Sequence, residues 1–347
     1  MTRNRMIPIV LIALVLSWVV CNDSRAQHIG AGFDVFSFFD NSEGNDSYRD
    51  TRTHTALRFT PRLGFATNDS THQVVGGYNF LYEYGTKNID LNGLVMYYKY
   101  QNKKLRVLFG SFPRTLMYEE MPEYLICDSI RYYRPQMTGF SFLYTHKNGH
   151  FEAFCDWIQK RTENEREQFM AGLSTRFRFN KFQLGAEGYL YHYALENGPL
   201  GEQHYIHETL TAHPYVGLLL SNEKAKFWTD IRAGLLFQAD RDRSDFQWHT
   251  PFGFILDADA HLRRFSLHET FYAGKRQQVF GNQGFGHYYW GDTFLQSPWY
   301  SRTDIGYLIV SGKNIKLDTK LIFNFTDKGM QWHQVLTLLY KFDIKFM

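Results

Sequence analysis

The stretch Tyr340-Lys341-Phe342-Asp343-Ile344-Lys345-Phe346 decides the fold class of this chain. Successive side chains of an extended strand point to opposite faces, so this stretch has one apolar face and one charged face. The same alternation recurs over residues 57–65, 168–179 and 315–325. A period of two, sustained in several segments, predicts an all-β protein built from amphipathic strands.

The charged face distinguishes a membrane-spanning barrel from a soluble sandwich. Strands of a sandwich are usually ~5–6 residues long, whereas several runs here reach the ~9–11 residues that cross a bilayer at a tilt. Arg, Lys and Asp recur on the second face of strand after strand, where a dry core would not tolerate them. A water-filled lumen would accommodate them. The sequence therefore predicts a transmembrane antiparallel up-and-down β-barrel.

Composition excludes several other classes of protein. Of 347 residues, 44% are hydrophobic, 18% are aromatic and 21% are charged, which is too apolar for a disordered chain. Three cysteines are too few for a disulfide scaffold, and we expect Cys127 and Cys155 to be free thiols rather than a pair. A formal net charge of +3 gives no indication of nucleic-acid binding.

The N-terminus reads as a secretory signal peptide, residues 1–26. Arg3 and Arg5 precede the apolar run 7–20, and Ser24-Arg25-Ala26 supplies small residues for cleavage. A lipoprotein anchored at Cys21 is the alternative, although Val20 is larger than the residue that usually precedes a lipidated cysteine. The mature chain, residues 27–347, is predicted to form a single barrel domain.

About sixteen strands account for the mature chain, and an even number places both termini on one side. Every second connection is short, for example Gln101-Asn102, Asn148-Gly149 and Gly312-Lys313, whereas the others are often much longer. Short periplasmic turns and longer outer loops are the usual asymmetry of outer-membrane barrels. The predicted strands are 28–39, 53–67, 72–84, 90–101, 103–112, 137–146, 150–158, 166–179, 181–194, 206–220, 225–238, 250–261, 264–273, 299–311, 314–326 and 330–346.

In strand number, turn asymmetry and aromatic placement, the chain resembles the sixteen-stranded bacterial outer-membrane porins. The resemblance implies an outer-membrane location, insertion by the barrel-assembly machinery through the C-terminal strand, and a homotrimer. One departure is that Met347 follows Phe346, where such barrels usually end in an aromatic residue. Barrels of ~16–18 strands leave an aqueous channel, so we expect a passive channel for small hydrophilic solutes and no enzyme.

Two outer connections, 113–136 and 274–298, are much longer than their neighbours. In general porins the third outer loop folds into the lumen as a constriction, and the alternative is a solvated surface loop. Opposed charges across a pore would favour dipolar solutes. The charged residues of the predicted constriction loop are Arg114, Glu119, Glu120, Glu123, Asp128, Arg131 and Arg134. The predicted lumen-facing wall residues are Arg58, Arg62, Arg106, Arg176, Arg178, Arg232, Asp257, Asp259, His268, Lys316 and Lys320.

Three further hypotheses remain open beside the passive channel, and for the channel we expect no cofactor and no metal ion. In every case we expect outer-membrane lipid and lipopolysaccharide around the barrel. One hypothesis is a channel selective for a sugar or an anion, and another is an adhesin or receptor that acts through its long loops. The third is a barrel-embedded hydrolase or acyl-modifying enzyme. For the third, a turn at Leu262-Arg263 would place Asp257 opposite His268 and Asp259 opposite Ser266, and an acid, an imidazole and a hydroxyl together support nucleophilic catalysis.

Overall fold

A computed structural model describes residues 27–162, 165–194, 206–222, 224–242, 247–281 and 289–344. Within these residues the chain forms sixteen β-strands. They are β1 (Gln27–Gly44), β2 (Thr53–Thr67), β3 (His72–Glu83), β4 (Asp90–Gln101), β5 (Leu105–Pro113), β6 (Gln136–His146), β7 (Gly149–Gln159), β8 (Glu167–Phe179), β9 (Phe182–Ala194), β10 (Ile206–Asn222), β11 (Phe227–Asp242), β12 (Phe252–Leu262), β13 (Phe265–Gly274), β14 (Trp299–Ser311), β15 (Ile315–Thr326) and β16 (Gly329–Ile344).

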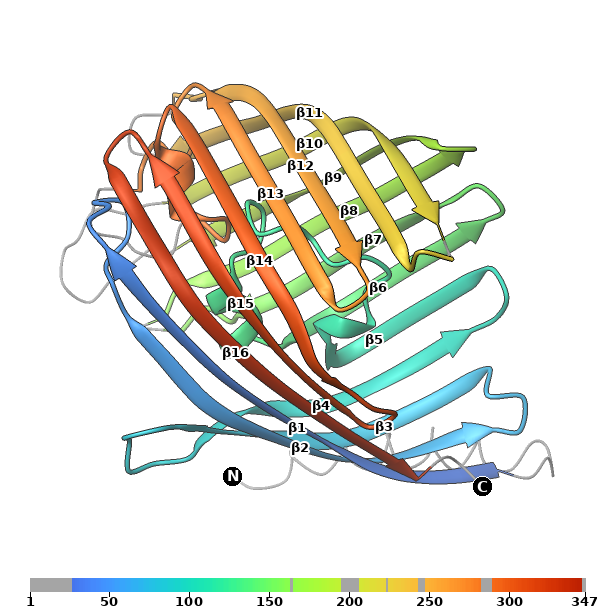
Figure 1. Cartoon of the computed structure of the whole chain (residues 1–347). Helices are drawn as coiled ribbons and strands as arrows, with labels where there is room; N and C mark the ends of the chain where they lie inside the picture. The colour runs from blue at the N-terminus through green and yellow to red at the C-terminus, as the bar shows by residue number, and fades with distance from the viewer. Residues whose placement is uncertain are drawn as a thin grey trace.

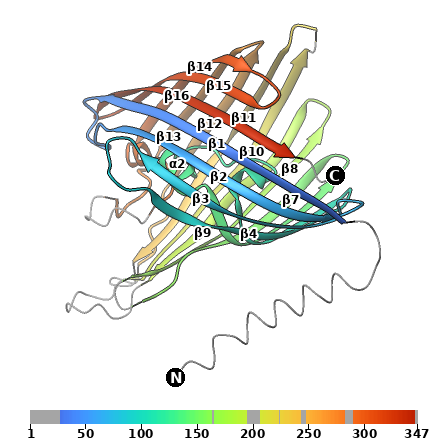
Figure 2. The same ribbon diagram turned by 90° about the horizontal axis from the view of Figure 1, so that it is seen from below.

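The strands form one closed antiparallel barrel in which each pairs with its neighbours in sequence (Figure 1). The ring closes where β1 pairs with β16, from Ala31–Ile344 to Gly44–Gln331 (Figure 2). Closure leaves no strand edge unpaired, which is the condition for a sheet in lipid. The predicted fold class and strand number are confirmed.

The two faces of the wall differ as the alternation predicts. Leu63, Phe109 and Phe182 are each more than 60% exposed on the outer face. On the inner face, by contrast, Glu152 and Asp257 are fully buried. An apolar exterior around a polar interior is the arrangement of a barrel that spans a membrane.

The described connections differ at the two ends of the barrel. Those after β2, β4, β6, β8, β10, β12 and β14 are short, whereas the connections after β5 and β13 are long. The short turns mark the periplasmic end and the long loops the outer end. Among the described residues, no helix is long and apolar enough to cross a membrane. The predicted signal peptide and the terminal Phe346-Met347 lie outside the described residues.

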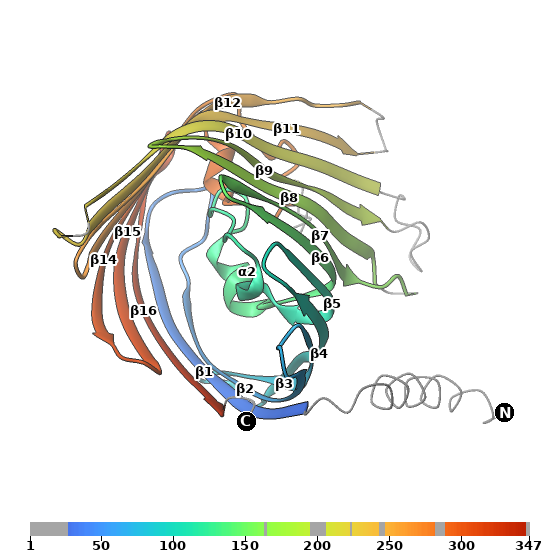
Figure 3. The same ribbon diagram turned by 90° about the vertical axis from the view of Figure 1, so that its right-hand side faces the viewer.

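The described residues of both long loops fold into the lumen, and Figure 3 shows α2 (Asp128–Tyr133) inside the ring of strands. The loop after β5 also contains a 3-10 helix, η1 (Arg114–Leu116), and the loop after β13 contains η2 (Thr293–Gln296). Loop residues such as Leu125, Trp290 and Phe294 form one buried apolar cluster with Tyr189 and Tyr191, which point inward from β9. This part of the lumen is therefore packed rather than water-filled. Both described cysteines, Cys127 and Cys155, are free thiols.

Candidate functional site

The loop of residues 113–136, which we call the inner loop, is fixed to the wall of the barrel at several strands. Its bridging pairs are Glu119–Arg176 (3.0 Å), Tyr124–His213 (2.7 Å) and Asp128–Arg302 (3.0 Å), with wall partners on β8, β10 and β14. At α2, the Tyr132 ring stacks on Phe38 of β1 with centroids 4.2 Å apart. The inner loop therefore crosses the lumen from one side of the wall to the other.

The charges of the inner loop mostly neutralise each other. Arg131 lies 3.1 Å from Glu120, 2.8 Å from Glu123 and 3.4 Å from Asp128. Burial opposes ionisation of Glu123, but Arg131 and Arg302 outweigh it and hold the pKa of that carboxyl well below its usual range. Arg131 thus pairs with three acids of its own loop instead of facing them across an open pore.

The remaining inner-loop arginines pack against other parts of the lumen. Arg114 pairs with Asp156 of β7, and its Nε donates to the carbonyl of Arg134 at 2.8 Å. Both guanidinium groups lie over the ring of Trp290, at 5.2 Å and 5.9 Å from the centroid. These residues join the two long loops to each other.

The predicted wall residues lie on inward-facing positions, and most are paired. Arg106 donates to Glu152 at 2.8 Å, and Arg176 to Asp230 at 2.9 Å. The other pairs are Arg62–Asp34, Arg62–Asp343 (3.1 Å), Arg232–Asp257, Arg232–Glu187 (3.4 Å), Lys316–Asp318 (3.3 Å) and Lys320–Asp304 (3.9 Å). Arg178 is exposed near the periplasmic end of β8, and Arg58 has a different environment described below.

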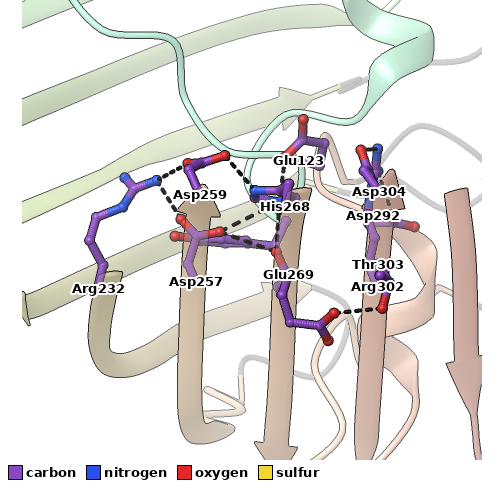
Figure 4. Close-up of polar contacts among 12 residues, drawn as sticks. Glu123, Arg232, Asp257, Asp259, His268, Glu269, Asp292, Arg302, Thr303 and Asp304 are labelled. Carbon is purple, nitrogen blue, oxygen red and sulfur yellow. Dashed lines mark hydrogen bonds and ion pairs between the residues drawn. The ribbon is translucent and has the colours of Figure 1, made fainter. Parts of the chain in front are cut away.

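An acid–imidazole–hydroxyl cluster lies at β12 and β13 beneath the inner loop (Figure 4). His268 Nδ1 is 3.0 Å from Asp259, and its Nε2 is 3.0 Å from the Thr270 hydroxyl. Carboxylates of Asp257 and Glu123 lie 3.5 Å and 3.6 Å from the same Nε2. The sequence predicted that Asp257, Asp259 and His268 lie close together, and the structure adds Thr270 and Glu123.

The observed pairing of β12 with β13 is shifted by two residues from the predicted register. The turn is Arg263-Arg264 rather than Leu262-Arg263, because Leu262 itself pairs with Phe265. The observed pairs are His261–Ser266, Asp259–His268 and Asp257–Thr270. The predicted facing pairs Asp257–His268 and Asp259–Ser266 are therefore wrong, although the three side chains still share one face.

The cluster is better suited to holding the inner loop than to nucleophilic catalysis. Carboxylates from β12 and from the inner loop surround His268, so the imidazole links Asp259 and Asp257 of the wall to Glu123 of the loop. The Thr270 hydroxyl donates its hydrogen to Asp257 at 3.2 Å, and Thr270 is only 1% exposed. Among the described residues, no group of three or more His, Cys, Asp or Glu side chains is arranged to hold a metal ion.

A second set of polar side chains lies on the outward face of the wall. His192 of β9 alternates with Tyr191 and Tyr193, which are buried inside the barrel, so His192 points outward. Glu208 of β10 is the cross-strand partner of His192, and Arg241 of β11 is the partner of Glu208. These three residues, which we call the outer triad, form a row across neighbouring strands.

The outer triad is held together by direct contacts. Arg241 Nε donates to Glu208 Oε2 at 3.1 Å, and His192 Nδ1 lies 3.8 Å from Glu208 Oε1. The imidazole also stacks on Phe169 of β8, with centroids 4.9 Å apart, and Phe169 stacks on Trp157 of β7 at 5.5 Å. Apolar rings thus border a histidine, a carboxylate and a guanidinium on the lipid-facing side.

The height of the outer triad follows from strand geometry. β9 leaves the periplasmic turn at Phe182 and reaches His192 ten residues later. At ~3.3 Å per residue and a tilt of ~40°, this is about 25 Å along the membrane normal, which is the height of the apolar band of such barrels. The outer triad therefore lies at the outer membrane–water interface.

The sequence alone did not identify the outer triad, because the outer end of β9 reverses the usual pattern: its aromatic residues face the lumen and its polar residue faces outward. Inward positions there hold Tyr189, Tyr191 and Tyr193, which pack on the loops in the lumen, so the polar residue between them reads as lumenal. The available signal is that Glu208 of β10 faces His192 and Arg241 of β11 faces Glu208, and it can be recognised only once the register of the strands is known.

The fold resembles solved outer-membrane barrels at low sequence identity. A loop-deletion mutant of OmpT, an outer membrane protein of Vibrio cholerae, has a TM-score of 0.55 and 9% identity, with 90% of this chain and 99% of that chain covered. Pseudomonas aeruginosa OpdK, solved with vanillate, has a TM-score of 0.50 and 12% identity, with 91% and 98% covered. Pseudomonas putida OprB has a TM-score of 0.52 and 8% identity, with 95% and 97% covered. These likenesses confirm the resemblance to sixteen-stranded porins in fold.

The family comparison corrects the functional expectation. No curated protein matches the chain, but the model of the lipid A 3'-O-deacylase-type family matches residues 21–347. The expectations of a passive channel and of no enzyme are therefore wrong, because strand number predicts the diameter of a barrel and not what occupies its lumen or its outer face. The chain belongs to the lipid A 3'-O-deacylase-type family.

Proposed function

We propose that this protein is an outer-membrane hydrolase that removes an ester-linked acyl chain from lipid A. The observation that carries the proposal is the match of the deacylase-type family model to residues 21–347, which includes the entire barrel. This is the acyl-modifying alternative that the sequence left open, with lipopolysaccharide as substrate rather than as surrounding lipid.

The location of lipid A selects among the candidate sites. Its acyl esters join the sugar headgroup to chains in the outer leaflet, so the groups that cleave them must face lipid near the outer interface. The outer triad meets both conditions, whereas the His268 cluster faces the lumen beneath the inner loop. We therefore assign the reaction to His192, Glu208 and Arg241.

Each residue of the outer triad has a role in ester hydrolysis. His192 takes a proton from a water molecule, whose oxygen attacks the ester carbonyl. The tetrahedral intermediate collapses as the C–O bond to the sugar breaks, and the imidazolium returns its proton to the sugar oxygen. Glu208 orients and stabilises the imidazolium, and the Arg241 guanidinium stabilises the developing oxyanion. The products are a fatty acid and a sugar hydroxyl.

Replacement of His192 tests this assignment. We expect His192→Ala to lower the rate of acyl release by about 100-fold or more, because it removes a general base. Purified variants in bilayers that contain lipid A would be assayed by mass spectrometry for loss of one acyl chain. His72→Ala is the matched control. His72 is an exposed histidine at the periplasmic end of the barrel, and its Nδ1 is hydrogen-bonded to the Tyr98 hydroxyl at 2.7 Å.

His268→Ala distinguishes the two sites. We expect it to retain the rate of acyl release, with reduced thermal stability. Retained activity in His192→Ala together with lost activity in His268→Ala would place the reaction in the lumen instead. No release by the wild-type protein would contradict the proposed function.

A further inference from the structure

A cavity of about 220 Å³ lies between the inner loop and the wall of the barrel. Its apolar lining comes from both sides, with Met117, Met121 and Ile126 on the loop and Met137 and Phe154 on the wall. Methionine side chains adapt to flexible apolar ligands because they are unbranched and polarisable. The cavity therefore suits a flexible hydrocarbon chain.

Most charged groups that line this cavity are neutralised by the protein itself. Glu119 pairs with Arg176 at 3.0 Å and Glu120 with Arg131 at 3.1 Å. Arg114, also in the lining, is paired with Asp156. Each of the two lining acids therefore has a cationic partner in its own loop or on the wall.

Arg58 of β2 is the exception among the lining residues. Within the described part of the chain, no carboxylate lies within 4.0 Å of its guanidinium, and the nearby Asp34 is bound to Arg62 instead. Its NH1 donates to the carbonyl of Tyr132 at 3.0 Å, and the group lies 4.8 Å from the Phe36 centroid. A partly buried cation without a counter-ion is costly, so an anion that reached it would be stabilised.

We propose that this cavity binds a single-chain fatty carboxylate, with the carboxylate on Arg58 and the alkyl chain among the methionines and Phe154. A guanidinium presents paired donors that match the two oxygens of a carboxylate. The site lies in the lumen, separate from the outer triad. The proposed function enters only as a source of the ligand, because deacylation of lipid A releases a fatty acid.

Binding of dodecanoate to the full-length protein in a non-ionic detergent tests the inference by isothermal titration calorimetry. We expect saturable one-to-one binding, and at least tenfold weaker binding of dodecanol, which has the same chain without the charge. Acetate, which has the charge without the chain, should also bind at least tenfold more weakly. Equal affinity for dodecanoate and dodecanol would overturn the role of Arg58.

Two arginines on the same strand give a matched pair of variants. Arg58→Gln should weaken dodecanoate binding at least tenfold, whereas Arg62→Gln should change it less than threefold, because Arg62 is bound to Asp34 and Asp343. Arg58→Lys keeps the charge and should restore binding to within about threefold of wild type. Barrel folding is checked for each by electrophoretic mobility with and without boiling.

Fatty-acid binding in the cavity and deacylation at the outer triad can be refuted independently of each other. His192→Ala should bind dodecanoate as the wild type does while acyl release is lost. If the wild type releases no fatty acid but still binds dodecanoate through Arg58, the cavity takes fatty acids from another source. Wild-type affinity in a folded Arg58→Gln variant, with acyl release intact, would refute the cavity site alone.

Discussion

At the scale of single residues, Glu123 shows how the inner loop is held. Its carboxylate is 12% exposed and is shared between Arg131, at 2.8 Å, and His268, at 3.6 Å. A buried ion pair is costly to break from one side, because the partner charge is left uncompensated. The cluster around His268, which resembles a catalytic site, thus holds the inner loop to the wall of the barrel.

We predict that Glu123→Gln destabilises the barrel by about 3 kcal/mol at pH 7, measured as a lower Tm. The matched control is Glu120→Gln, which removes a carboxylate that also contacts Arg131 but is 75% exposed, and it should cost under about 1 kcal/mol.

The effect of Glu123→Gln has a defined dependence on pH. Because the pKa of Glu123 is lowered in the folded protein, its carboxylate contributes stability above the usual glutamate pKa and loses it as the pH falls through the lowered value. The Tm difference between wild type and variant should therefore be constant from pH 7 to pH 5 and shrink only below about pH 4. A difference that has vanished at pH 5 would contradict the pairing.

At the scale of elements, the pairing of β1 with β16 completes the barrel. Gly32 of β1 lies opposite Asp343 of β16, and a Cβ added at Gly32 would overlap the Asp343 carboxylate and the backbone of Phe342. Gly76 of β3 is a matched glycine, since an added Cβ there meets nothing within 4 Å.

We predict that Gly32→Val lowers the yield of folded barrel at least twofold, because overpacking at a closed seam costs about 1–3 kcal/mol. Gly76→Val should fold like the wild type. The measurement is the fraction of heat-modifiable protein after refolding into detergent. Equal folded fractions for the two variants would show that closure of β1 on β16 is not sensitive to this contact.

At the scale of the whole molecule, the barrel presents two separate chemical surfaces. The lumen is crosslinked by ion pairs and filled in part by an apolar cluster, and the outer face carries the outer triad. A closed barrel makes such separation possible, because adjacent residues of one strand lie on opposite sides of the wall.

We predict that the mature protein begins at Gln27, with residues 1–26 removed on export. N-terminal sequencing of protein purified from outer membranes checks this. A lipid-modified N-terminus at Cys21 would instead support the lipoprotein alternative.

The alternation of residues determined the barrel, its approximate strand number and its inward arginines, because a period of two is a local property that needs no tertiary contact. It also identified residues 113–136 as an exceptional loop and placed Asp257, Asp259 and His268 on one face. The observed register at the Arg263-Arg264 turn is shifted by two residues from the predicted one. Such a shift keeps each side chain on the same face but changes every cross-strand partner, so the pairs themselves could not be predicted.

What only the tertiary structure decided is which groups meet across strands and what fills the lumen. His192, Glu208 and Arg241 are separated by 16 and 33 residues in the sequence and meet only through register. Arg58 is distinguished because, among the described residues, no carboxylate lies within 4.0 Å of its guanidinium. The physical reason is that side-chain alternation fixes the direction of each residue, whereas charge pairing and packing depend on the closed sheet and on loops folded inside it.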